Sequence, residues 1–136
     1  LEPAPGKVEV SGGDTLLGGT GNDTLTAGSG RALMIGGLGL DRITGGSNSD
    51  LIVDGQTTSD NDAAALAHIL ADWISALTYD QRADHVIADH LGGTNVIHDG
   101  SVDILLGAGD DDLFFAKLDA PNLDSIGDKV GIERSI

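Results

Sequence analysis

Acidic side chains recur at a fixed spacing along the first part of this chain. Residues 9–53 divide without a gap into five nonapeptides, whose sixth positions hold Asp14, Asp23, Ala32, Asp41 and Asp50. Aspartate carboxylates in turns are ligands for hard cations, and Ca²⁺ takes about six to eight oxygens. More than half of the 21 glycines lie in the same stretch, where they let backbone carbonyls crowd around one ion. The spacing therefore predicts cation-binding loops.

A second column of residues indicates what positions these loops. The eighth position of each nonapeptide is apolar and holds Leu16, Leu25, Met34, Ile43 and Ile52. Side chains alternate along a strand, so a three-residue strand with this residue at its centre turns it inward. A flexible Gly/Asp linker has no reason to keep an aliphatic residue at every ninth position. Six loop residues followed by three extended residues are the predicted unit.

The nonapeptides resemble the RTX, or haemolysin-type calcium-binding, repeat family. Its consensus is G-G-x-G-x-D-x-U-x, and GGTGNDTLT and GGLGLDRIT match every position of it. The resemblance implies a mainly β fold, a parallel β-roll in which two nonapeptides make one turn. It also implies that loops two repeats apart clamp one Ca²⁺ between them, through both Asp side chains and backbone carbonyls.

On this pattern the strongest calcium site lies between Asp23 and Asp41. The residues of its two loops are Gly18, Gly19, Thr20, Gly21, Gly36, Gly37, Leu38 and Gly39. On the other side the column runs Asp14, Ala32, Asp50, so each neighbouring pair lacks one carboxylate, and Arg31 adds a positive charge beside the gap. Calcium is expected to bind weakly there, or not at all.

The outward positions of the strands differ between the two sides. In the strands of the second and fourth repeats the outward residues are Thr24, Thr26, Arg42 and Thr44, which are polar and can face solvent. The strands of the first, third and fifth repeats turn out Thr15, Leu17, Leu33, Ile35, Leu51 and Val53. Such an apolar face needs a cover.

A helical hairpin over about residues 60–92 is the predicted cover. Its apolar stripe consists of Leu66, Ile69, Leu70, Trp73 and Leu77 at helical spacing. Residues 60–62 offer N-caps, Thr78 and Gln81 form a capping box, and Gly92 and Gly93 end the second helix. Trp73 is interpreted as a core residue rather than a platform for a sugar.

The nine-residue register returns over residues 94–136, where the roll is expected to resume. Val96, Leu105 and Phe114 continue the inward column, and Asp103 is expected to stack beyond Asp50 and complete a site on that side. In the loop GAGDDD the spacing selects Asp112 and the local motif selects Asp111, so both stay candidates. More than one calcium ion is therefore predicted.

Composition narrows the remaining partners. The chain has 136 residues, a formal net charge of −15 and no cysteine. Long-range repulsion makes nucleic acid an improbable partner, and no apolar run of about 18 residues predicts membrane insertion. Residues 1–8 are interpreted as a linker or cloning remnant, and residues 9–136 as one calcium-binding domain of a larger protein.

The four histidines do not indicate an enzyme. His68, His85, His90 and His98 lack a catalytic signature, and the five-residue spacing of His85 and His90 is poor for sharing one helix face. They are interpreted as surface or capping residues.

The predicted function is a non-catalytic calcium-binding module of a secreted or cell-surface bacterial protein. RTX proteins typically use type I secretion, and the stretches DNDAAALAHILADW and GAGDDDLFF also resemble C-terminal modules of very large bacterial surface proteins of the planctomycete type. The alternative is an adhesin or carbohydrate-binding module in which calcium only scaffolds a surface for a glycan or other partner.

Overall fold

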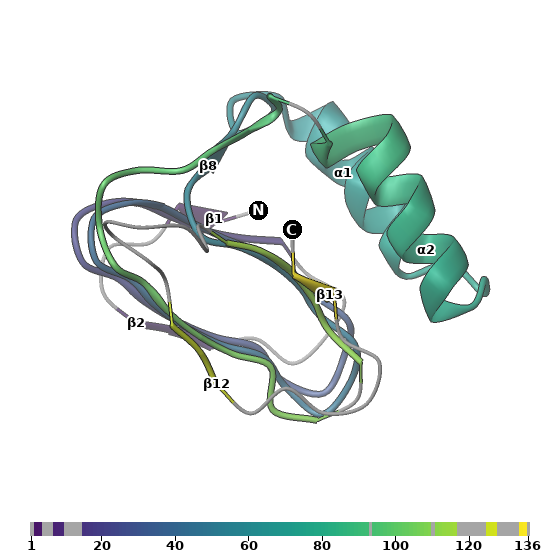
Figure 1. Ribbon diagram of the computed structural model, residues 1–136, viewed down its shortest axis with the longest axis horizontal. Coiled ribbons are helices and arrows are strands. Elements are labelled where there is room, and N and C mark those ends of the chain that lie inside the picture. The colour runs from purple at the N-terminus through teal and green to yellow at the C-terminus, as the bar shows by residue number, and fades with distance from the viewer. Residues whose placement is uncertain are drawn as a thin grey trace.

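The protein is described here by a computed structural model covering residues 2–3, 7–9, 15–92, 94–109, 111–116, 125–127 and 134–135. Two parallel sheets face each other across a narrow core, and two helices pack beyond one of the sheets (Figure 1). Asp14 lies outside the described residues.

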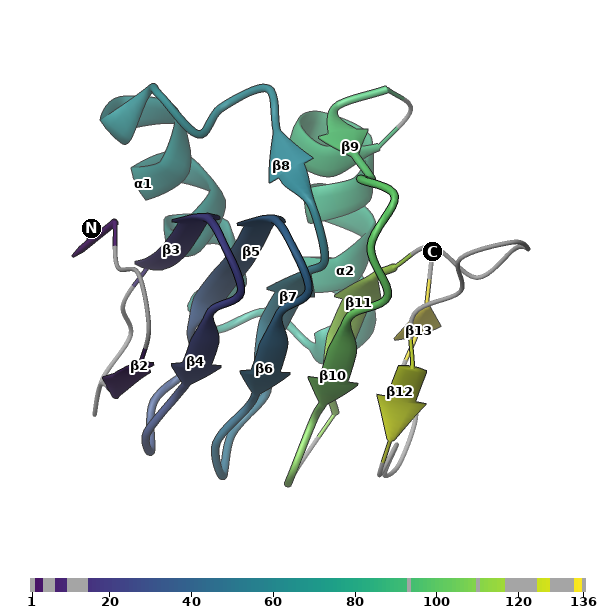
Figure 2. The same ribbon diagram turned by 90° about the vertical axis from the view of Figure 1, so that its left-hand side faces the viewer.

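Successive strands alternate between the two sheets. The six-stranded sheet has the order β1 (Glu2–Pro3), β3 (Thr15–Thr20), β5 (Leu33–Leu38), β7 (Leu51–Val53), β11 (Leu113–Phe115) and β13 (Arg134–Ser135). The five-stranded sheet has the order β12 (Ser125–Gly127), β10 (Ile104–Leu106), β6 (Arg42–Thr44), β4 (Thr24–Thr26) and β2 (Lys7–Glu9). Figure 2 shows the five-stranded sheet in front, with its strands side by side. Each glycine-rich loop thus carries the chain from one sheet to the other.

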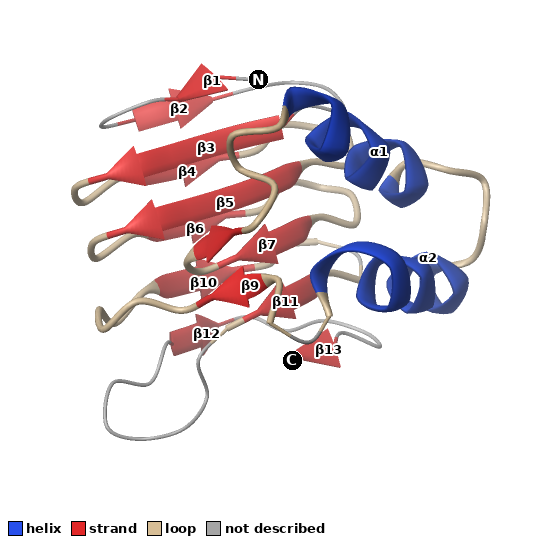
Figure 3. Ribbon diagram, turned by 90° about the horizontal axis from the view of Figure 1, so that it is seen from above, coloured by secondary structure: helices blue, strands red, loops and turns tan. Residues whose placement is uncertain are grey.

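The helices leave the stack of strands through a short antiparallel ribbon. It is formed by β8 (Gln56–Thr57) and β9 (Val96–Ile97). Between them lie α1 (Ala63–Trp73), α2 (Tyr79–Val86) and η1 (Ile87–Leu91), a π-helical turn that continues α2 (Figure 3). The sheets resume their register afterwards, because β10 pairs with β6 and β11 pairs with β7.

The core has two parts, on either side of the six-stranded sheet. Between the sheets lie Leu16, Leu25, Met34, Ile43, Ile52, Leu105 and Phe114, which occupy the predicted inward column. Between this sheet and the helices lie Leu33, Ile35, Leu51, Val53, Leu66, Ile69, Trp73, Ala83, Val86, Leu91, Leu113 and Phe115. The outward apolar residues of β5 and β7 are therefore covered by the helices.

The predicted fold class, a mainly β parallel β-roll with an inserted helical hairpin packed on one sheet, is wrong. The chain has mixed α/β content, with two parallel sheets and a layer of two helices. The physical reason lies in the second core: the helices do not merely shield the sheet but bury their own apolar residues against it. Nonapeptide spacing describes only the strands and loops, and it says nothing of this third layer.

Local sequence explains the ends of the helices. The Asp62 side chain accepts a hydrogen bond from the backbone of Ala65 at the start of α1, and Thr78 with Gln81 forms the predicted capping box of α2.

Trp73 is fully buried, and its indole N–H donates to the Ser49 carbonyl at 2.9 Å. Leu77, predicted to belong to the apolar stripe, is instead exposed in the loop between the helices.

Arg31 serves the helical layer rather than the loops. Its guanidinium donates to the Ser75 carbonyl at 2.9 Å, just beyond the C-terminal end of α1. A cation at this end of a helix satisfies carbonyls that have no partner within the helix. Arg31, predicted to add a positive charge beside the gap at Ala32, therefore also links this segment to the C-terminal end of α1.

Candidate metal centre

Three aspartates form a column across the five-stranded sheet, at the end of the sheet where its strands begin. Asp23, Asp41 and Asp103 each directly precede a strand, and the three strands β4, β6 and β10 are neighbours. The Asp23 backbone N–H donates to Asp41 Oδ1 at 2.9 Å, and the Asp41 backbone N–H donates to Asp103 Oδ1 at 2.6 Å. The carboxylates of Asp41 and Asp103 are thus each held against the backbone of the neighbouring aspartate.

A second column crosses the six-stranded sheet in the same way, at the end of the sheet where its strands begin. The Ala32 backbone N–H donates to Asp50 Oδ1 at 2.8 Å, and the Asp50 backbone N–H donates to Asp112 Oδ1 at 2.6 Å. Asp14, predicted to begin this column, lies outside the described residues. Ala32 contributes no carboxylate, so the column is interrupted as the sequence indicated.

Two predictions about the second half of the chain are resolved by these columns. Asp103 was expected to stack beyond Asp50, but it stacks beyond Asp41, because β10 joins the five-stranded sheet next to β6. Asp112 takes the position beyond Asp50. Of the two candidates in GAGDDD, Asp112 therefore belongs to the column and Asp111 lies just before it, half-buried.

The carboxylates of the first column are buried close together. Asp23, Asp41 and Asp103 are at most 3% exposed. The pKa of the Asp41 carboxyl is raised to about 7, mainly because burial disfavours its charged form. The hydrogen bond from Asp23 opposes this effect, whereas the negative charges of Asp103, Asp23 and Asp99 reinforce it. Asp41 Oδ2 is buried and accepts no hydrogen bond from the described residues.

The first glycine of each loop makes room for these carboxylates. A Cβ at Gly36 would lie 2.7 Å from Asp41 Oδ2 and 2.5 Å from the Asp54 carbonyl oxygen. At Gly18 a Cβ would lie 3.0 Å from Asp23 Oδ2. At both positions the closest atom is a backbone carbonyl oxygen of the neighbouring turn of the chain, Gly36 O at Gly18 and Asp54 O at Gly36. Only a residue without a side chain fits between the stacked backbones and the carboxylates.

The glycines at the second and fourth positions of the same loops are required by their backbone conformation. Gly19, Gly21, Gly37 and Gly39 have φ angles between 93° and 118°, a region that other residues rarely adopt. The two loops stack in register, with Gly19 beside Gly37 and Thr20 beside Leu38. Thr20 and Leu38, whose carbonyl groups are predicted calcium ligands, therefore lie side by side in the stacked loops. Their side chains face solvent.

Asp99 was not recognised from the sequence as a residue of this site. Its Oδ2 accepts a hydrogen bond from the Gly39 backbone N–H at 2.7 Å, so a fourth carboxylate approaches the loop of Asp41. The signal was present in the spacing, since Asp99 lies in the six-residue loop that ends at Asp103. The spacing alone did not reveal Asp99 as a site residue, because this loop, HDGSVD, lacks the glycine pattern of the earlier repeats.

Ligands for a cation in these loops would have to include backbone oxygens. Within the described part of the chain, only Asp72, His85 and Asp89 bring three carboxylate or imidazole ligand atoms within 4.8 Å of one another, and these residues lie on the helices. In the loops, the carboxylates of Asp41, Asp103, Asp50 and Asp112 already accept backbone hydrogen bonds. Carboxylates and glycine-loop carbonyls would together supply only oxygen ligands, the kind that Ca²⁺ prefers.

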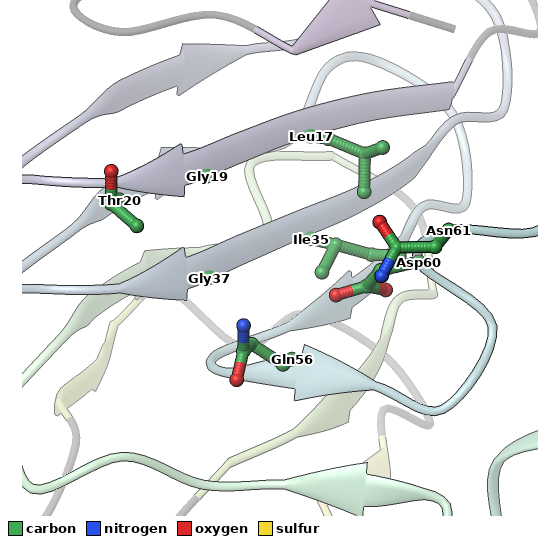
Figure 4. A pocket seen from close by; sticks show the side chains of 8 residues that line it. All are labelled: Leu17, Gly19, Thr20, Ile35, Gly37, Gln56, Asp60 and Asn61. Carbon is green, nitrogen blue, oxygen red and sulfur yellow. The ribbon is translucent and has the colours of Figure 1, made fainter.

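A pocket of about 330 Å³ lies on the outer side of the six-stranded sheet, next to the ribbon. Figure 4 shows its apolar floor, formed by Leu17 and Ile35, and the polar side chains of Gln56, Asp60 and Asn61 at its rim. Asp60 accepts hydrogen bonds from the backbone and hydroxyl of Thr57, which holds the rim in place. The pocket contains none of the column aspartates.

Comparison with family models, with curated proteins and with solved structures finds no match to this chain. Among the described helices, none has the length and apolar character needed to cross a membrane.

Proposed function

We propose that this chain is a non-catalytic calcium-binding module of a secreted or cell-surface protein. The observation that carries the proposal is the buried column of Asp23, Asp41 and Asp103, in which the pKa of Asp41 is raised to about 7. Burying like charges together is costly, and a divalent cation offsets both the desolvation and the repulsion. The module therefore has a physical reason to take up a cation.

The residues proposed to hold the first ion are Asp23 and Asp41, with carbonyl oxygens of loops 18–21 and 36–39. Asp103 extends the same column, and Asp50 with Asp112 offers a second pair of carboxylates. When bound, Ca²⁺ supplies positive charge between the stacked loops and favours the ionised carboxylates. Several ions along the two columns are part of the proposal.

Calcium is proposed to control folding. At a net charge of −15 the calcium-free chain repels itself, and this repulsion opposes the compact state. Binding to the folded state alone stabilises it, in proportion to the logarithm of the free calcium concentration. A chain made at low cytosolic calcium would then complete its folding outside the cell, which suits the type I secretion that the RTX resemblance implies.

A non-catalytic role is favoured by how the acidic side chains are used. The column aspartates accept backbone hydrogen bonds within the loops rather than lining an open cleft. The structure gives less support to the alternative of a carbohydrate-binding module. Trp73, which could have served as a platform for a sugar, is buried and cannot stack on one.

The proposal is tested by titrating the whole chain with CaCl₂ in a calorimeter and by following circular dichroism and thermal unfolding. Extracellular calcium modules bind at about 10⁻⁴ to 10⁻³ M, so ~10 mM calcium is a suitable upper limit. Asp41→Asn is expected to weaken binding, whereas Asp84→Asn, at an exposed position on α2, serves as the matched control. MgCl₂ at the same concentration controls for ionic strength. Identical spectra and melting temperatures in chelator and in ~10 mM calcium would refute the proposal.

A further inference from the structure

We propose that Asp72, His85 and Asp89 form a second metal site, for a divalent transition metal ion such as Zn²⁺. It lies on the helical layer and shares no residue with the glycine-rich loops. It neither depends on the proposed calcium function nor follows from the repeat pattern.

The three side chains come from different parts of the helical layer. Asp72 is in the last turn of α1, His85 is near the end of α2, and Asp89 is in the π-helical turn η1. One ligand atom of each lies within 4.8 Å of the others. Ligand atoms held about 2 Å from a tetrahedral zinc ion are about 3.4 Å apart. Small side-chain rotations would therefore close the site around an ion.

His90 is proposed to position Asp72. Its Nε2 lies 2.6 Å from Asp72 Oδ2, and the two side chains are 18% and 40% exposed, respectively. A carboxylate that ligates a metal is commonly oriented by a hydrogen bond from a neighbouring group. His90 would hold Asp72 in this way while leaving its other oxygen for the metal.

The π-helical turn explains why His90 lies on the same side of the helix as this cluster. In a regular α-helix, residues five positions apart, such as His85 and His90, point to different faces. Hydrogen bonds from residue i to i+5 widen the turn over Ile87–Leu91, and turns of this kind are frequent at functional sites. His85 and Asp89 are four positions apart and would share a helix face in any case, whereas the wider turn allows His90 to contact the same aspartate, Asp72.

The donor chemistry selects the class of metal. An imidazole nitrogen with two carboxylate oxygens suits Zn²⁺, Ni²⁺ or Cu²⁺, whereas Ca²⁺ prefers a shell made of oxygens alone. Two carboxylates and a neutral imidazole leave a formal charge of −2, which a divalent cation neutralises. His85 and Asp89 are exposed, so an ion would reach the site without opening the fold.

The test is a calorimetric titration of the whole chain with ZnCl₂ at pH 7.5, with ~10 mM calcium present to occupy the loops. One Zn²⁺ per chain is expected. His85→Ala and Asp89→Asn are each expected to lower the affinity by about ten-fold or more. Both side chains are exposed, so the variants are expected to keep the wild-type circular dichroism spectrum. His68→Ala removes an exposed histidine of α1 outside the cluster and is expected to bind like wild type.

The positioning role of His90 has its own test. His90→Ala is expected to reduce the affinity about ten-fold with the stoichiometry unchanged, and His90→Gln, which keeps a donor, is expected to restore part of it. The proposal is overturned if Zn²⁺ fails to bind at ~1 mM, well above the range of specific sites, or if His85→Ala binds it as tightly as His68→Ala.

Discussion

The backbone N–H of Asp41 donates a 2.6 Å hydrogen bond to Oδ1 of Asp103, although 62 positions separate the two residues. The earlier pair in the same column, Asp23 and Asp41, is separated by 18 positions. The ribbon and helices between β7 and β10 are therefore inserted without disturbing the order of the aspartates. The insertion adds a helical layer outside the sheets, and the column of aspartates continues in the strand that follows the insertion.

Removing the Asp103 carboxylate is expected to leave the Asp41 backbone N–H buried without an acceptor. Asp103→Ala should lower the free energy of unfolding by about 1–3 kcal/mol in calcium-free buffer. Asp103→Asn keeps an oxygen acceptor and removes a negative charge, so it should cost less. Urea denaturation of both variants in chelator measures the difference. Equal losses would mean that the hydrogen bond to Asp41 is not the reason.

Restoring the missing carboxylate at Ala32 should couple stability to calcium more strongly. Ala32 is fully buried and its N–H donates to Asp50, so Ala32→Asp places a charge into a closed site. Without calcium the variant should be less stable by about 1–3 kcal/mol. With calcium it should recover more stability than wild type and bind an additional ion. Ala76→Asp, at an exposed position between the helices, is the control, and thermal unfolding with and without calcium is the measurement.

The raised pKa of Asp41 predicts a pH dependence in the absence of calcium. A carboxyl with a folded-state pKa of about 7 binds its proton more tightly in the folded than in the unfolded state. Its contribution to stability is therefore fully present at low pH and is lost as the pH rises toward 7. Between pH 5 and 7.5 the calcium-free protein should lose stability by up to a few kcal/mol, since each pKa unit corresponds to about 1.4 kcal/mol.

Asp41→Asn isolates this group from the others that titrate in the same range. The variant should show a flatter dependence of stability on pH than wild type, measured by urea denaturation at several pH values in chelator. Saturating calcium should flatten the wild-type curve as well, because the cation favours the ionised carboxylate. A parallel pH dependence in variant and wild type would assign the effect to other groups.

Truncations on α1 and in the loop that follows it should separate buried from exposed positions. Leu66 is buried against the six-stranded sheet, so Leu66→Ala should cost about 2–5 kcal/mol, although it touches no column aspartate. Leu70 is only partly buried and should cost less. Leu77→Ala, in the exposed loop, should change the free energy of unfolding by less than about 0.5 kcal/mol. Similar losses at Leu66 and Leu77 would contradict the packing of the helices on the sheet.

Much of the local structure was determined by the sequence alone, because it follows from short-range periodicity. The nine-residue spacing predicted which residues turn inward, from Leu16 to Ile52, and all of them lie between the sheets. The outward apolar residues of β5 and β7 predicted a covered face, and the capping box at Thr78 predicted the start of α2. Each of these depends on neighbours within about one repeat or one helical turn.

Other features were decided only by the tertiary structure, because they depend on which strands become neighbours. The fold class is mixed α/β since the helices bury a core of their own. Asp103 extends the column of Asp41 rather than that of Asp50, because after the insertion the chain re-enters the five-stranded sheet first. The cluster of Asp72, His85 and Asp89 requires the packing of α1 against α2, and the contact of His90 with Asp72 requires the π-helical turn as well. Spacing along the chain does not encode such long-range neighbours, because an insertion changes the separation in sequence without changing the separation in space.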